Sequence, residues 1–85
     1  MSYQYEEFKD WTLSDDGQRA VCAALIRAQK LHKTAGAFIE TRITEGLVSD
    51  SWKMLAITDR LEEMGYISQI TPSTHRPRFY QYEEP

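Results

Sequence analysis

The feature that most constrains the fold is a change of hydrophobic period at Gly65. Over residues 49–64, apolar side chains recur at helical spacing behind a polar cap, which predicts one helix that stops at the glycine. Over residues 66–71 and 78–82, apolar side chains alternate with polar ones, which predicts two short strands. Two prolines interrupt residues 72–77, so this segment is predicted to be a loop. The C-terminal half is therefore a helix that leads directly into a β-hairpin.

Two further helices are predicted upstream. Ser14 caps the first, in which apolar residues recur at helical spacing from Val21 to Leu31, with Cys22 and Ile26 widening the stripe. Thr34 ends this helix and caps the second. The apolar positions of the second helix are Ala35, Phe38, Ile39 and Ile43. The predicted order is helix, helix, helix and hairpin.

The first 13 residues are aromatic and acidic, and the sequence leaves their structure open. The two tyrosines alternate as in a short strand, whereas Phe8 and Trp11 have the spacing of a helical turn. The pentapeptide of residues 3–7 also recurs as residues 80–84. Two such segments can pair as edge strands, but we interpret the recurrence as a coincidence.

Length and composition exclude several classes of protein. Eighty-five residues with 41 % apolar side chains suit one folded domain, and no stretch approaches the roughly 20 apolar residues of a bilayer span. Residues 1–7 lack the basic start and apolar run of a signal peptide. The single cysteine excludes an internal disulfide, and His32 and His75 have no further metal ligands at suitable spacing. We therefore expect a soluble, cytoplasmic protein without a metal or other cofactor.

The sequence contains no catalytic constellation. No pairing of a nucleophile with a base is visible, and the four glycines form no phosphate-binding loop. Neighbouring carboxylates such as Glu62 and Glu63 are typical of a solvated face. We therefore expect that the protein is not an enzyme.

The charge is unevenly distributed along the chain, although its sum is only −3. One lysine stands against five acidic residues over residues 1–17, whereas nine cations stand against six acidic residues over residues 18–82. The middle of the chain is therefore mildly basic between two acidic ends. Such a distribution is compatible with a modest nucleic-acid contact, because that binding depends on local charge.

The order of elements, ending in the segment DRLEEMGYI at Asp59–Ile67, resembles the winged helix-turn-helix superfamily of small bacterial and phage-type regulators. The resemblance covers about residues 18–82. It implies an α+β winged-helix fold, in which three helices precede a two-stranded hairpin wing. On this basis residues 14–85 form the winged-helix domain, and residues 1–13 form a short N-terminal aromatic extension.

The resemblance also implies a DNA-binding surface, because the third helix of this family lies in the major groove and the wing contacts the backbone or the minor groove. The positions that correspond to the recognition helix are Ser51, Trp52, Lys53, Leu55 and Ala56. The positions that correspond to the wing are Thr74, His75, Arg76 and Arg78. The leading expectation is therefore a small transcriptional regulator that binds double-stranded DNA.

The sequence departs from the family pattern in two respects. The distance from Thr34 to Met54 is about five residues longer than usual, and the third helix lacks side chains suited to reading bases. At helical spacing its core stripe is Met54, Ile57, Thr58, Leu61 and Met64, and its opposite face is Trp52, Leu55, Ala56, Asp59 and Glu63. Direct readout relies on Arg, Lys, Asn or Gln, whereas an outward apolar patch often marks a protein partner.

Two hypotheses follow from this apolar face and from the aromatic extension. The alternative function is an adaptor, which binds another protein through the outward face of the third helix and does not bind DNA. Trp52 then contacts a partner, contacts DNA, or is buried beneath residues 43–48 or the N-terminal segment, and we favour burial. We also expect a homodimer, whose contact is supplied by Tyr3, Tyr5, Phe8 and Trp11.

Overall fold

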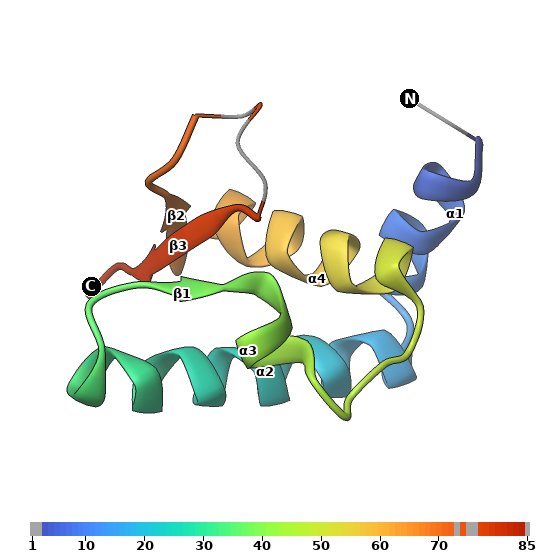
Figure 1. Cartoon of the computed structure of the whole chain (residues 1–85). Coiled ribbons are helices and arrows are strands. Elements are labelled where there is room, and N and C mark those ends of the chain that lie inside the picture. The colour runs from blue at the N-terminus through green and yellow to red at the C-terminus, as the bar shows by residue number, and fades with distance from the viewer. Residues whose placement is uncertain (1–2, 73, 75–76, 85) are drawn as a thin grey trace.

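The computed structural model describes residues 3–72, 74 and 77–84, the first two of them by their backbone alone. The described residues form four helices and a three-stranded antiparallel sheet of order β1-β3-β2 (Figure 1). In chain order the elements are α1 (Tyr3–Trp11), α2 (Asp15–Thr34), β1 (Phe38–Ile39), α3 (Glu40–Thr44), α4 (Ser51–Glu63), β2 (Ile67–Gln69) and β3 (Phe79–Tyr82). The fold is α+β, and this arrangement is compatible with a winged-helix-like fold. The division at residue 14 stays a prediction.

The ends of the two longest helices confirm the sequence prediction. The Ser14 hydroxyl caps α2 by accepting a hydrogen bond of 3.1 Å from the Gly17 N–H, and Asp50 caps α4 by accepting one of 2.7 Å from the Trp52 N–H. Gly65 follows α4 with φ of +83°, a conformation that L-residues rarely adopt. It therefore lets the chain reverse from α4 into β2.

The segment after Thr34 corrects the sequence prediction. A single second helix was expected there, but Phe38 and Ile39 form strand β1 and α3 begins only at Glu40. The strand is stabilised because Phe38 pairs with Tyr80, stacks its ring on that of Tyr80 at 6.4 Å between centroids, and is buried with it. Residues 35–39 therefore separate the end of α2 from the start of α3.

The hairpin of β2 and β3 confirms the predicted change to strands, with Ile67 opposite Tyr82 and Gln69 opposite Tyr80. The recurring pentapeptide adopts two different structures, since residues 3–7 lie in helix α1 and residues 80–82 lie in strand β3. The two copies therefore do not pair with each other. The surroundings of each copy, rather than its local sequence, decide its conformation.

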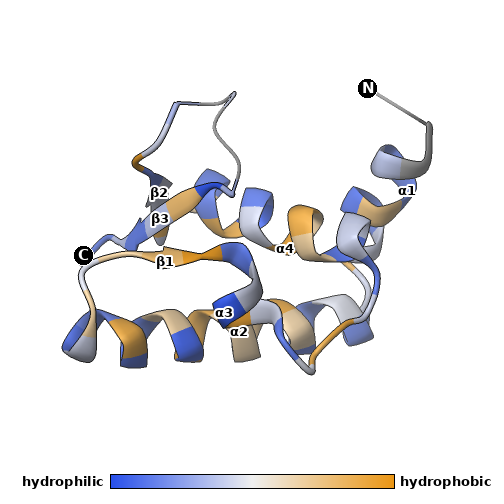
Figure 2. Ribbon diagram, viewed as in Figure 1, coloured by the Kyte–Doolittle hydropathy of each residue, from blue (hydrophilic) through white to orange (hydrophobic). Residues whose placement is uncertain are grey.

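The core lies between the sheet, α2 and α4, and apolar residues are concentrated along β1 and β3 (Figure 2). Leu61 and Ile67 are buried as predicted. Met64 was predicted to be buried but is 54 % exposed, because it follows the last turn of α4. Cys22 and Ile26 are also exposed, so the buried stripe of α2 is narrower than predicted. Its buried residues are Gly17, Ala20, Val21, Ala24 and Ala28.

Substitution of Ile67 tests the packing of the hairpin on α4. Ile67 is 1 % exposed, whereas Ile70 of the same hairpin is 49 % exposed and provides a matched control. We expect Ile67→Ala to lower the free energy of unfolding by about 2–5 kcal/mol, and Ile70→Ala to lower it by less than about 1 kcal/mol. Urea unfolding measures both values. Equal shifts of the two midpoints would contradict this packing.

Candidate functional site

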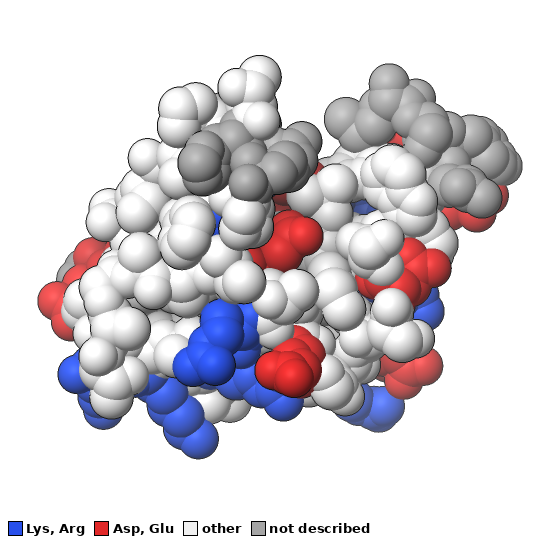
Figure 3. Space-filling view, viewed as in Figure 1, with Lys and Arg blue, Asp and Glu red and all other residues white. Residues whose placement is uncertain are grey.

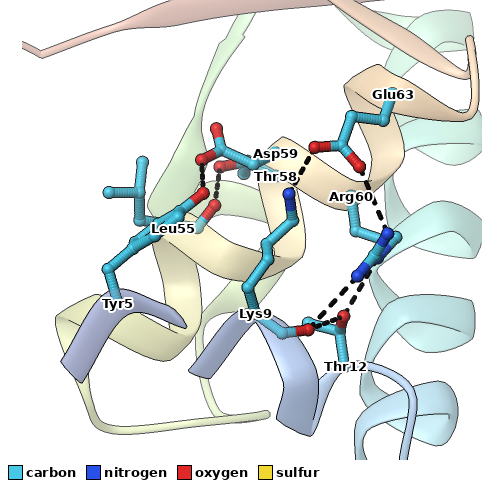
Figure 4. Close-up of polar contacts among 8 residues, drawn as sticks. All are labelled: Tyr5, Lys9, Thr12, Leu55, Thr58, Asp59, Arg60 and Glu63. Carbon is cyan, nitrogen blue, oxygen red and sulfur yellow. Dashed lines mark hydrogen bonds and ion pairs between the residues drawn. The ribbon is translucent and has the colours of Figure 1, made fainter. Parts of the chain in front are cut away.

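Helix α1 lies along one flank of α4 (Figure 1), so the N-terminal segment is helical and not a strand. The Tyr5 hydroxyl donates a hydrogen bond to the Asp59 carboxylate (Figure 4). One turn further along both helices, the Lys9 ammonium group forms an ion pair with Glu63. The two helices therefore meet along matching rows of side chains.

Arg60 of α4 donates hydrogen bonds to the C-terminal end of α1 (Figure 4). Its Nε lies 3.0 Å from the Thr12 hydroxyl and its Nη2 lies 3.2 Å from the Lys9 carbonyl oxygen. The Thr12 hydroxyl, which is fully buried, also donates to that carbonyl at 2.6 Å. A cation is favoured at this position, because the last carbonyls of a helix lack partners within the helix and carry partial negative charge.

Aromatic rings close the contact between the two helices. Tyr5 is 5 % exposed, and its ring meets that of Trp52 edge to face at 6.2 Å between centroids. The Lys53 ammonium group lies 4.6 Å from the centroid of the Trp11 ring. Because Tyr5 and Trp11 make these contacts within one chain, less aromatic area than expected is left for a homodimer. The homodimer stays a prediction.

The contacts between α1 and α4 shift the pKa values of two of their groups. Burial, together with the hydrogen bond to Asp59, raises the pKa of the Tyr5 hydroxyl further above neutral pH. The hydrogen bond from Lys9, together with the charge of Arg60, lowers the pKa of Glu63. Glu63 therefore contributes stability above its pKa in the unfolded chain, and this contribution is lost as the pH falls through its lower folded-state pKa.

The structure places the predicted recognition residues in different environments. Ala56 is fully buried, so the prediction that it faces outward is wrong; α1 covers this flank of α4. Lys53 is half-buried over Trp11, and Leu55 is half-buried, whereas Ser51 is exposed. Trp52 is 38 % exposed at the edge of α1, so it is not the core residue that we favoured.

The base of the wing meets the start of α4 at a groove of about 230 Å³. The groove is lined by Glu40, Ser51, Trp52, Leu55, Pro77 and Arg78. Of the predicted wing residues, Arg78 is half-buried here and Thr74 is exposed, whereas His75 and Arg76 lie outside the described residues. Sequence reasoning missed Glu40, because its position at the start of α3 depends on the unexpected strand β1.

The face formed by α1 and α4 is acidic at its surface. Its cations are turned inward: the side chains of Lys9 and Arg60 are 16 % and 21 % exposed and both pair with Glu63. The exposed carboxylates of the two helices are those of Glu6, Glu7, Asp10, Glu62 and Glu63. Lys and Arg side chains instead gather along the lower edge of the view over α2 (Figure 3). Lys30 and Lys33 of α2 are exposed.

The described part of the chain contains no group of three or more His, Cys, Asp or Glu side chains that could hold a metal ion. None of the helices in that part is both long and apolar enough to cross a membrane. Comparison with protein-family models, curated proteins and solved structures finds no significant match to this chain. The functional argument therefore rests on the geometry of the site.

Substitution of Arg60 tests whether its contacts hold α1 on α4. Arg19 provides a matched control, because it also pairs with a carboxylate three residues away, but its side chain is 78 % exposed. We expect Arg60→Gln to lower the free energy of unfolding by about 1–3 kcal/mol, since buried acceptors lose their donors. Arg19→Gln should lower it by less than about 0.5 kcal/mol. Similar losses in urea unfolding would mean that Arg60 acts only as a surface ion pair.

Proposed function

We propose that the protein is a winged-helix-like adaptor, which binds a partner protein through the exposed face of α4 and does not read DNA bases. The order of α2, β1, α3, α4 and the hairpin supports the winged-helix part of this proposal, as does the Asp59–Ile67 segment. That part is an analogy at the level of the fold, and function does not follow from it. The choice between DNA and protein rests on α4 itself.

The observation that carries the proposal is that α1 packs on one flank of α4. Ala56 is fully buried, and Lys53, the cation among the predicted reading residues of this helix, is held over Trp11. The side chains left open at the start of α4 are Ser51, Trp52 and part of Leu55. A tryptophan and a leucine cannot form the bidentate hydrogen bonds by which bases are read. A tryptophan is, however, a preferred anchor of protein interfaces.

The charge of the α1–α4 face also favours a protein partner. Binding to DNA depends on cations that neutralise phosphates. Here Glu62 and Glu63 are exposed on α4, whereas Lys9 and Arg60 pair with Glu63. A duplex laid along α4 would bring its phosphates towards carboxylates, which is electrostatically unfavourable.

DNA binding remains the second candidate, and a different surface favours it. Lys30, Lys33 and Arg42 are exposed on α2 and α3. Such a surface can hold phosphates without reading sequence, and its affinity falls with salt. Contact through these cations would leave the exposed part of α4 free.

Binding of DNA to the protein and to two of its variants distinguishes an adaptor function of α4 from DNA binding. A labelled duplex of random sequence is titrated with the full chain in about 50 and 200 mM salt, and binding is followed by fluorescence anisotropy. We expect only weak binding, which is unchanged in Trp52→Ala and lost in the double variant Lys30→Gln/Lys33→Gln. Thermal melting confirms that each variant is folded. The opposite result is submicromolar binding of the duplex that is weakened by Trp52→Ala and unaffected by Lys30→Gln/Lys33→Gln. That result would make α4 the DNA-binding surface and contradict the proposed adaptor function.

A further inference from the structure

We infer that the partner presents a basic amphipathic helix, whose apolar side chains rest on Trp52 and Leu55 and whose cations face the carboxylates of α1 and α4. This inference rests on the proposed function and names the chemistry of the partner. It is carried by three observations: an apolar seat at the groove, exposed carboxylates along α1 and α4 beyond this seat, and sheet edges that are poorly suited to adding a strand.

The apolar seat lies where α4 begins. Trp52 is 38 % exposed, and Leu55 follows it almost one turn later at the same groove. Pro77 lines the groove from the side of the wing. The Tyr5 ring contacts the Trp52 ring edge to face. The indole is therefore held in place before any partner arrives, which lowers the entropic cost of binding.

The groove itself is lined by one carboxylate, Glu40, and one half-buried cation, Arg78. Beyond the groove, the surface of α1 and α4 is acidic because its cations are used within the chain. Lys9 and Arg60 pair with Glu63, and Lys53 lies over Trp11. The carboxylates of Glu6, Glu7, Asp10 and Glu62 are exposed on the two helices. Carboxylates that lie along α1 and α4 beyond an apolar anchor favour a helix that is laid along them with Lys or Arg flanking its apolar stripe, and disfavour an acidic one.

The secondary structure favours a helix over a strand as the bound form. Strand β1 has only two residues, so it offers a short edge. On the other edge, the Gln69 N–H of β2 already donates to the Glu62 carboxylate at 3.0 Å. Addition of a strand to the sheet is therefore poorly supported. The apolar side chains at the start of α4 instead suit a helix laid into a groove.

A second copy of this chain is a weaker occupant than a separate partner. Its α2 does expose Ile26 together with Lys30 and Lys33. However, a contact between α2 of one copy and α4 of the next joins two different surfaces. Such a contact closes in a two-fold dimer only if both copies make it at the same time; otherwise it leads to rings or open chains of molecules. Self-association through α2 and α4 would overturn the inference.

The test uses three labelled peptides of about 18 residues that differ only in charge. Each carries leucines on one helical stripe, and the flanking positions are lysine in the first peptide, glutamine in the second and glutamate in the third. The full-length protein is titrated into each peptide in roughly 50 and 300 mM salt, and anisotropy reports binding. We expect the lysine peptide to bind at least about tenfold more tightly than the glutamate peptide, with a difference that shrinks at high salt.

Variants of the protein locate the binding site. Trp52→Ala and Glu62→Gln should each weaken binding of the lysine peptide, whereas Ile26→Ala, which removes an exposed side chain from α2, should leave it unchanged. Glutamine at position 62 keeps an acceptor for the Gln69 N–H, so the loss of charge is isolated from the loss of that hydrogen bond. Thermal melting of Trp52→Ala shows whether it folds. If it does not, Glu62→Gln alone decides.

Four results would overturn the inference in distinguishable ways. If the three peptides bind equally and Trp52→Ala weakens all of them, the proposed function stands but the partner need not be basic. Binding insensitive to Trp52→Ala and Glu62→Gln would place the site elsewhere. Binding of none of the peptides would remove the amphipathic helix, while the DNA titration separately decides the proposed function. Self-association in sedimentation, abolished by Ile26→Glu, would make a second copy the occupant.

Discussion

The contact on which the functional account depends is that of Arg60 with the C-terminal end of α1. One guanidinium group donates to the Thr12 hydroxyl, the Lys9 carbonyl and the Glu63 carboxylate. Because Thr12 is fully buried, the loss of this donor would leave a buried acceptor less well satisfied. Helix α4 is therefore fixed on two sides, by the core through Leu61 and by α1 through Arg60.

This double packing determines which part of α4 remains accessible. In a helix packed on one side only, Ala56 and Lys53 would be open to a ligand. Here the first is buried and the second lies over Trp11. The accessible remainder is narrow, with Trp52 near the start of α4 and the carboxylates of Glu62 and Glu63 near its end. A surface of this kind is better matched to an apolar side chain with cationic neighbours than to a base edge.

The sequence predicted those parts of the fold that depend on local signals. The change of period at Gly65 predicted the order of α4 and the hairpin, and Ser14 and the polar cap at the start of residues 49–64 marked two helix starts. Strand β1 was missed, because it has two residues and is stabilised by pairing with β3, which is distant in the sequence. The repeated pentapeptide makes the same point, since identical residues form a helix against α4 and a strand in the core.

The candidate site was predicted only in part for the same physical reason. Periodicity correctly separated Leu61 and Ile57 from Trp52. For the N-terminal segment it left a strand and a helical turn open, and the segment forms helix α1. Periodicity cannot indicate which second element covers an outward face, so the burial of Ala56 had no signal in the sequence.

The most direct measurement of the packing of α1 on α4 is a nuclear Overhauser spectrum of the Tyr5 and Trp52 ring protons. The packing of α1 on α4 predicts cross-peaks between the two rings. Absence of these cross-peaks in the full chain, with random-coil shifts for residues 5–11, would contradict the account.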